Sequence, residues 1–149
     1  MKYIITGSSS GLGAELAQEL MSFGAVIGIS RRTIDDEWAK TGIYDHVVCD
    51  LSKLSEKKEL TKLKLQLNEL VCEEPFVLII NAAKFHSSDV RLNISATKEM
   101  FNLNLFSVIS LINISQKFNL KRIIIINSIS GLIGQELQHE YVASKHALM

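Results

Sequence analysis

Three residues near the end of the chain, Ser128, Tyr141 and Lys145, are of types that can move protons and orient a substrate oxygen. Tyr141 and Lys145 stand four positions apart, which places both side chains on one face of a helix. A tyrosine hydroxyl titrates near pH ~10 in water, and a nearby ammonium group favours the phenolate form. Ser128 precedes Tyr141 by thirteen positions and can hydrogen-bond a substrate oxygen. A tyrosine and a lysine at this spacing also occur on ordinary helices, so the pair alone does not establish an active site.

Glycines and serines between positions 7 and 13 form a second candidate site. Gly7, Gly11 and Gly13 have the spacing G-x-x-x-G-x-G, which departs from the G-x-G-x-x-G dinucleotide pattern. Glycines in such a turn let the backbone approach a pyrophosphate closely, and the N-terminus of the next helix attracts phosphate. A plain connecting turn is the alternative, but its place between a strand and a helix favours nucleotide binding. The predicted cofactor contacts in this turn are Gly7, Ser9, Ser10, Gly11, Leu12 and Gly13.

Short apolar segments alternate with helical ones along the chain, a pattern typical of a parallel sheet covered by helices on both faces. Strands are predicted over residues 3–6, 25–30, 45–50, 76–80 and 121–127. Helices are predicted over 12–20, with Leu12, Leu16 and Leu20 on one face, over 55–73 and 95–118, from near Glu140, and as a short helix around 35–38. A polar loop is expected over 84–93. The sequence therefore predicts an α/β fold with a doubly wound, Rossmann-like parallel sheet of five strands in the order 3-2-1-4-5.

The helix predicted over 95–118 carries more apolar side chains than one buried stripe requires. The surplus suggests a second buried face, against a partner subunit, and deeper burial within the monomer is the alternative. The apolar residues concerned are Met100, Phe101, Leu103, Leu105, Phe106, Val108, Ile109, Leu111, Ile112 and Ile114.

Composition limits the classes of function. The 149 residues, of which 47% are hydrophobic and 21% charged, fit one globular domain over 1–149. The formal net charge of +0 gives no indication of a nucleic-acid or anionic-membrane partner. No apolar run is long enough to span a bilayer and none resembles a signal peptide, so a cytoplasmic protein is expected. Cys49 and Cys72 lack metal-ligand spacing, so both are expected to be reduced, largely buried thiols, and no metal site is predicted.

Small and polar residues follow the predicted strands at the edge where ligands bind in such sheets. Ser30 and Arg31, followed by Arg32, end the second strand, where an acidic residue would be expected to read a ribose 2′-hydroxyl. An arginine there suits a 2′-phosphate, and two solvated arginines are the alternative. Asp50 ends the third strand, and Asn81, Ala82 and Ala83 end the fourth. NADP(H) is therefore predicted in preference to NAD(H).

These motifs, read together and in order, resemble the short-chain dehydrogenase/reductase family over the whole chain from Tyr3 onward. The stretch 6–13 is similar to the TGxxxGxG cofactor turn of the family. Asn81-Ala82-Ala83 is similar to the last three positions of its NNAG motif, with Ile80 and Ala83 in place of the first Asn and the Gly. The remaining matches are Asp50 and Leu51, where the family contacts the adenine ring, and Asn104, Ser128 and the segment 141–145, which match the catalytic Asn, Ser and YxxxK.

The resemblance implies hydride transfer between a nicotinamide and a small carbonyl or alcohol substrate. Tyr141 would exchange a proton with the substrate oxygen, which Ser128 would orient. Lys145 would hold the nicotinamide ribose and assist the tyrosine, so Tyr141 and Lys145 also belong to the cofactor site. Asn104 would support a proton-relay water. The helices over 95–118 and from near 140 would form the homo-oligomer surface.

Three other interpretations stay open. A non-catalytic nucleotide-binding protein could keep this fold, and a sugar-nucleotide epimerase-like relative would share the tyrosine and lysine, although its turn usually is TGxxGxxG. The chain could also be a piece of an enzyme, because the family ordinarily continues into further strands and this sequence stops within the helix of Tyr141 and Lys145. In that case we expect the chain alone to bind nucleotide weakly, to self-associate and to lack activity.

Overall fold

Five parallel strands form one sheet in the computed structural model, which describes residues 1–34, 36–85 and 93–149. The strand order is β3-β2-β1-β4-β5, with β3 and β5 at the edges. The predicted fold class and strand order are therefore confirmed. The strands are β1 (Lys2–Thr6), β2 (Ala25–Ser30), β3 (Tyr44–Val48), β4 (Phe76–Ile80) and β5 (Leu120–Ile125), and β4 and β5 change register between Phe76 and Val77.

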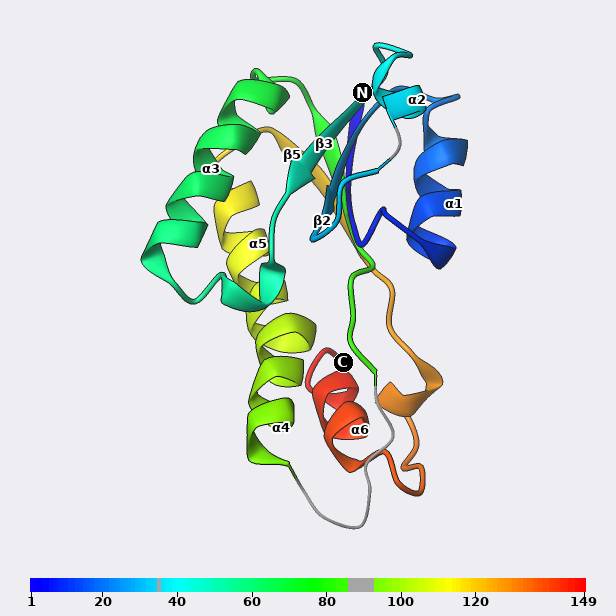
Figure 1. Cartoon of the computed structure of the whole chain (residues 1–149), viewed down its shortest axis with the longest axis vertical. Coiled ribbons are helices and arrows are strands. Elements are labelled where there is room, and N and C mark those ends of the chain that lie inside the picture. Colours follow the sequence, from blue (N-terminus) through cyan, green and yellow to red (C-terminus); the bar gives the residue numbers. More distant parts are fainter. Residues whose placement is uncertain (35, 86–92) are drawn as a thin grey trace.

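Helices cover both faces of the sheet (Figure 1). α1 and α2 lie on one face, α3 and α5 lie on the other, and α4 and α6 extend past the carboxyl ends of the strands. The helices are α1 (Gly11–Leu20), α2 (Asp36–Ala39), α3 (Lys57–Val71), α4 (Ile94–Phe101), α5 (Ser107–Ser115) and α6 (His139–His146). Among the described residues, none of these helices has the length and apolar character required to cross a membrane.

Successive side chains of each central strand enter opposite cores, which explains the continuous apolar runs. Ile4 packs in a larger core with Leu67 of α3 and Leu111 of α5. Ile5, the next residue, packs in a smaller core with Ala17 of α1. Because neighbouring residues of a strand point to opposite faces, a strand covered on both sides must be apolar throughout.

Helix α3 buries a stripe with a spacing of four residues, formed by Leu63, Leu67 and Val71. The helix ends earlier than the predicted residue 73, because Cys72 and Glu73 adopt left-handed backbone angles (φ 48° and 63°). A left-handed residue ends an α-helix by itself, so the helix stops before it reaches Pro75.

The long helix predicted over 95–118 is not one regular helix. A π-helical segment, η2 (Asn102–Phe106), separates α4 from α5, and the helix ends at Ser115. Within the monomer four of its ten apolar residues are buried, namely Met100, Val108, Leu111 and Ile114, and four are half-buried, while Phe106 and Ile109 remain 51% and 55% exposed. Burial within the chain therefore accounts for much of the apolar surplus.

Leu12 does not share the buried face of α1. The residues that α1 buries most deeply are Gly13 and Ala17. Leu16 and Leu20 pack beside the smaller core, whereas Leu12 is 56% exposed. Leu12 is in the first turn of α1, directly after Gly11, where the helix begins and its side chain does not reach the core. The prediction that the three leucines share one face is wrong for Leu12.

Two predicted segments reach residues whose structure is not described. The short helix expected around 35–38 forms as α2 over Asp36–Ala39, and Asp35 lies outside the described residues. The polar loop expected over 84–93 contains residues 86–92, which also lie outside them.

The two cysteines are free thiols in different environments. Cys49 is buried, as expected, but Cys72 is exposed at the left-handed end of α3, where its thiol donates to the carbonyl oxygen of Glu69 at 2.6 Å. The prediction that both are buried is therefore wrong for Cys72, because the helix ends at that residue. Burial, with smaller contributions from the charges of Glu59 and Asp50, raises the pKa of the Cys49 thiol to about 11.

Two leucines of α3 provide a matched test of the core. Leu67 is 0% exposed, whereas Leu65 on the same helix is 60% exposed. Leu67→Ala should lower the free energy of unfolding by about 2–5 kcal/mol, because it leaves a cavity between helix and sheet. Leu65→Ala should change it by no more than ~0.5 kcal/mol. Urea unfolding of both variants measures the difference, and equal losses would contradict the described packing.

Thiol labelling should separate the two cysteines. At about pH 8, a thiol reagent should modify Cys72 quickly and Cys49 slowly, since the raised pKa keeps the buried thiol neutral. Labelling of Cys49 should accelerate as the pH rises toward 11, the value near which the thiol ionises. Mass spectrometry of timed reactions measures both rates, and Cys72→Ser should remove only the fast one. Rapid modification of Cys49 at the lower pH would argue against its burial.

Candidate active site

The glycine turn after β1 and the start of α1 are in direct backbone contact. Gly7 has a φ of 73°, in the left-handed region that glycine adopts without strain. A Cβ atom on Gly13 would lie 2.2 Å from the carbonyl oxygen of Gly7, so only glycine permits this approach. The two glycines therefore hold the start of the helix against the end of the strand.

The N-terminus of α1 leaves backbone donors available. Ser10 precedes the helix with an extended backbone, and its side chain forms no capping hydrogen bond. The first N–H groups of a helix have no partner within the helix, and the helix dipole places partial positive charge there. An anionic group beside this turn would accept hydrogen bonds from the free N–H groups and would interact favourably with the positive end of the helix dipole.

A cavity of about 260 Å³ lies between the glycine turn and the segments that follow the strands. It brings together most of the predicted cofactor residues: Gly7, Ser9, Ser10, Ser30, Arg31, Arg32, Leu51, Asn81, Ala82 and Ala83. Gly11, Leu12, Gly13, Asp50, Tyr141 and Lys145 are not part of its wall. The sequence reasoning missed three wall residues, Ile29, Cys49 and Leu103, although each directly precedes a predicted residue.

A hydroxyl at the end of β1 fixes the segment that follows β4. The Thr6 hydroxyl accepts hydrogen bonds from the backbone N–H groups of Asn81 (3.0 Å) and Ala82 (2.9 Å). The Asn81 amide donates to the carbonyl oxygen of Thr6 at 3.1 Å. Thr6 was not predicted as a site residue. Its position at the end of β1, beside the end of the neighbouring strand β4, could have identified it.

The two arginines after β2 differ in their contacts. Arg32 reaches across to the glycine turn, where its guanidinium donates to Ser10 Oγ at 2.9 Å and lies 3.5 Å from Ser9 Oγ. Arg31 is exposed and also lines the cavity. Ser30 is buried, and its hydroxyl donates to the carbonyl oxygen of Arg32 at 2.6 Å. The Ser30 hydroxyl therefore supports the arginine backbone.

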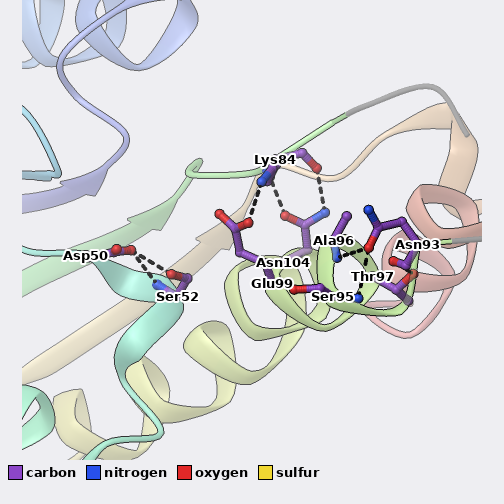
Figure 2. A network of polar contacts seen from close by, with 9 residues as sticks. All are labelled: Asp50, Ser52, Lys84, Asn93, Ser95, Ala96, Thr97, Glu99 and Asn104. Carbon is purple, nitrogen blue, oxygen red and sulfur yellow. Dashed lines mark hydrogen bonds and ion pairs between the residues drawn. The ribbon is translucent and has the colours of Figure 1, made fainter.

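Asp50 shapes the segment after β3, whereas Leu51 faces the cavity. One carboxylate oxygen of Asp50 accepts from the backbone N–H of Ser52 (3.1 Å) and from its hydroxyl (2.7 Å), as Figure 2 shows. This contact caps the short helical turn η1 (Leu51–Lys53). Leu51, at the start of that turn, is buried and lines the cavity.

Asn104 lies in the π-helical segment η2 and is buried. Its side chain pairs with the backbone of Lys84, accepting from the N–H at 2.8 Å and donating to the carbonyl oxygen at 2.9 Å (Figure 2). It also donates to Ser144 Oγ on α6 at 3.0 Å. The Lys84 ammonium forms an ion pair with Glu99 at 2.7 Å. Asn104 thus joins the loop after β4 to the helix that carries Tyr141 and Lys145.

The side chains of Tyr141 and Lys145 share one side of α6, as the spacing predicts. The Lys145 amine is buried, donates to the carbonyl oxygen of Ile126 at 3.3 Å, and lies 5.9 Å from the centre of the Tyr141 ring. This burial lowers the pKa of Lys145. The ring of Phe85 packs edge-on against Tyr141, with ring centres 5.0 Å apart. The Tyr141 hydroxyl forms no hydrogen bond with any residue that the structure describes, so it is available to a ligand.

Ser128 directly precedes η3 (Ile129–Gly131), a short helical turn that packs against α6. Its Oγ accepts from the backbone N–H of Ser130 at 3.2 Å. In the described chain no hydrogen bond joins Ser128 to Tyr141 or Lys145, so these residues lie on adjoining elements without direct pairing.

The cavity fits the phosphate-bearing part of a dinucleotide. Free helix donors, the two arginines and the glycine backbone supply positive charge and N–H groups on one side. Leu51 and Ala82 give an apolar surface on another. The described residues contain no group of three or more His, Cys, Asp or Glu side chains placed to bind a metal ion.

Comparison with known proteins gives consistent matches. A family model described as short chain dehydrogenase matches residues 2–149. The mouse (Mus musculus) protein "Dehydrogenase/reductase SDR family member 7" is 31% identical over 97% of this chain and 46% of its own length. This chain spans about half the length of the curated relatives it matches, from 46% to 60%.

Solved structures agree with this match. A short-chain dehydrogenase/reductase from Burkholderia vietnamiensis superposes with a TM-score of 0.87 at 22% identity, over 99% of this chain and 72% of that one. A 4-hydroxyisoleucine dehydrogenase, solved with NADH and succinate, superposes with a TM-score of 0.81 at 26% identity, over 98% and 67% of the two chains. Since the family model extends over almost the entire sequence, and the glycine turn, the cavity beside it and the helix with Tyr141 and Lys145 lie at the carboxyl ends of the strands, this chain belongs to the short-chain dehydrogenase family.

Proposed function

We propose that the chain provides the cofactor site and the acid–base residues of an oxidoreductase that interconverts a carbonyl and an alcohol. One observation carries this proposal. The Tyr141 hydroxyl, which has no hydrogen bond to any described residue, is on α6 one helical turn from the buried Lys145, and α6 lies at the same end of the sheet as the glycine turn. A non-catalytic nucleotide-binding protein would have no need for this pair.

The cofactor would be held by residues of three strand ends. The glycine turn and the first N–H groups of α1 would bind the pyrophosphate. Leu51 and Asp50 would lie beside the adenine, and Asn81, Ala82 and Ala83 would line the path toward the nicotinamide. When bound, the nicotinamide supplies or accepts the hydride.

The residues around α6 would handle the proton and the substrate oxygen. Tyr141 would donate a proton from its hydroxyl to the substrate oxygen during reduction, and accept one during oxidation. Ser128 would orient that oxygen through its own hydroxyl. Lys145 would bind the nicotinamide ribose and favour the phenolate of the neighbouring tyrosine when its amine is protonated. Asn104 would act as a positioning residue, because it fixes the loop after β4 to α6 and could hold a relay water there.

The arginines support NADP(H) as the preferred cofactor. The two positions directly after β2 are Arg31 and Arg32, with no acidic residue there, and both arginines line the cavity. A guanidinium pairs with a phosphate through two parallel hydrogen bonds, which suits a ribose 2′-phosphate. NAD(H) is the second candidate, and the NADH complex of the 4-hydroxyisoleucine dehydrogenase favours it.

We also propose self-association through the outer side of the long helix and α6. Phe106 and Ile109 are the large apolar side chains that α5 and η2 leave more than half exposed within the described chain. Pairing of two copies would remove this apolar area from water.

The cofactor proposal predicts a selective loss on removing either arginine. Arg31→Ala and Arg32→Ala should each weaken NADP⁺ binding by roughly tenfold or more, the effect of one lost charge-assisted hydrogen-bond pair. NAD⁺ binding should change by no more than about twofold, within the effect of an exposed side chain. Isothermal titration calorimetry measures the affinity of each variant for NADP⁺ and for NAD⁺. Lys121→Ala, which removes an exposed charge on β5, is the control. Equal affinity of the unmutated chain for the two cofactors would refute the preference, as would equal losses in the variants.

The acid–base proposal predicts a loss of turnover with cofactor binding retained. Tyr141→Phe should lower the rate of carbonyl reduction by about 10²–10⁴-fold, because it removes the transferable proton and little else. Lys145→Ala should weaken both cofactor binding and turnover. The measurement is NADPH oxidation in a preparation that reduces a ketone or aldehyde, with cofactor affinity determined in parallel. A Tyr141→Phe protein that keeps most of its activity would show that another group transfers the proton.

A further inference from the structure

A chain of hydrogen bonds connects β3 to both phosphate-facing segments of the cavity. His46 Nε2 lies 2.9 Å from the carbonyl oxygen of Arg32 and 3.1 Å from Ser30 Oγ. His46 Nδ1 lies 3.0 Å from the Tyr44 hydroxyl, which lies 3.1 Å from Ser8 Oγ in the glycine turn. The sequence analysis identified Ser30 and Arg32 as site residues, but not Ser8, Tyr44 or His46.

The surroundings of Tyr44 fit its hydroxyl closely. Tyr44 is 3% exposed, and Ser8 is completely buried. Gly28 of β2 lies across from them, and a Cβ atom there would come within 1.8 Å of the Tyr44 oxygen and 2.5 Å of Ser8 Oγ. The Trp38 ring packs edge-on against Tyr44, with ring centres 5.2 Å apart, and the His46 ring is stacked on it at 5.9 Å. The tyrosine is therefore fixed from several sides.

The carbonyl oxygen of Arg32 determines the tautomer of His46. A carbonyl can only accept, so a hydrogen bond to it requires the proton on Nε2. In the neutral ring, Nδ1 then accepts from the Tyr44 hydroxyl, and the Tyr44 oxygen can accept from Ser8, since either hydroxyl of that pair can donate. Burial of the ring, which lowers the pKa of His46, is consistent with this neutral form.

The consequence of these bonds lies at Arg32. Two donors, Ser30 Oγ and His46 Nε2, hold its carbonyl oxygen, and its guanidinium then reaches Ser10 in the glycine turn. Arg32 lines both the cavity already described and a second one of about 500 Å³, whose wall includes Ser9, Thr33 and Trp38. The hydrogen bonds to the Arg32 backbone therefore help to fix the position of the arginine side chain relative to both cavities.

We propose that His46 and Tyr44 are positioning residues for recognition of the cofactor's 2′-phosphate. They hold the Arg32 backbone so that the guanidinium faces the hydroxyls of Ser9 and Ser10, where the phosphate of NADP(H) binds. This inference rests on the proposed preference for NADP(H). A purely structural role for the two side chains would alter the binding of both cofactors alike.

The test compares three variants by titration with NADP⁺ and NAD⁺. His46→Leu removes both ring nitrogens and should weaken NADP⁺ binding roughly 3- to 10-fold, the range of one or two lost hydrogen bonds. His46→Gln keeps an N–H donor for the Arg32 carbonyl, so its affinity for NADP⁺ should stay within about twofold of that of the unmutated chain. Tyr44→Phe should weaken NADP⁺ binding in the same direction as His46→Leu. NAD⁺ affinity should stay within about twofold throughout, as for Val48→Ala, a substitution at an exposed position of β3 that serves as the control.

A second readout does not depend on the cofactor. Long-range ¹H–¹⁵N spectra of the unliganded chain should show the His46 proton on Nε2, and Tyr44→Phe should shift the Nδ1 resonance because it removes the donor. If the unmutated chain binds both cofactors equally, the proposed NADP(H) preference fails and this inference fails with it. If it prefers NADP⁺ but His46→Leu and Tyr44→Phe retain the preference, or if the proton is on Nδ1, the inference alone is overturned.

Discussion

The backbone contact between Gly13 and the carbonyl oxygen of Gly7 is the constraint on which the site depends. It removes the space that a side chain would occupy, so the start of α1 lies directly on the end of β1. Asn81 closes the same corner, because its amide binds the Thr6 carbonyl while its own N–H binds the Thr6 hydroxyl. The carboxyl ends of β1 and β4 and the free N–H groups of the helix therefore meet at one point, where an anion can be bound without any charged side chain.

Asn104 has a comparable role on the other side of the site. A π-helical segment adds a residue to one helical turn, and such segments often occur where a side chain must be turned toward a functional site. Here the turned side chain uses both its carbonyl and its amide group on Lys84 and reaches Ser144 as well. The helix with Tyr141 and Lys145 is thereby attached to the loop after β4 by hydrogen bonds rather than by apolar packing alone. Such bonds are directional, so they fix the orientation of α6 as well as its distance.

The sequence was sufficient to predict the sheet and to identify most of the residues that line the cavity beside the glycine turn, because both follow from local patterns. The apolar run Phe76–Ile80 predicted a strand covered on both faces, and the glycine spacing predicted the tight turn between β1 and α1. The features that were missed depend on contacts between distant residues. The Tyr44–Ser8 and His46–Arg32 hydrogen bonds join residues that are far apart in the sequence. No local pattern encodes these bonds, the exposure of Leu12 or the π segment at Asn104. Ser30 shows the same limit, since it lines the cavity but its hydroxyl donates to the carbonyl oxygen of Arg32, a contact that the sequence does not reveal.

The strand order has a consequence for how the chain reaches this structure. β1 is the central strand, and it pairs with β2 on one side and with β4 on the other. During synthesis from the N-terminus, β2 and β3 emerge early, whereas β4 follows only after the whole of α3. One edge of the most apolar part of the sheet therefore remains unpaired while the middle of the chain is still being made. Contacts between sequence-distant strands form slowly, and exposed strand edges in partly folded chains are prone to aggregation. The residues of β4, Phe76–Ile80, close this edge, and Asn81 directly after them lines the cavity, so the late strand completes both the sheet and the wall of the site.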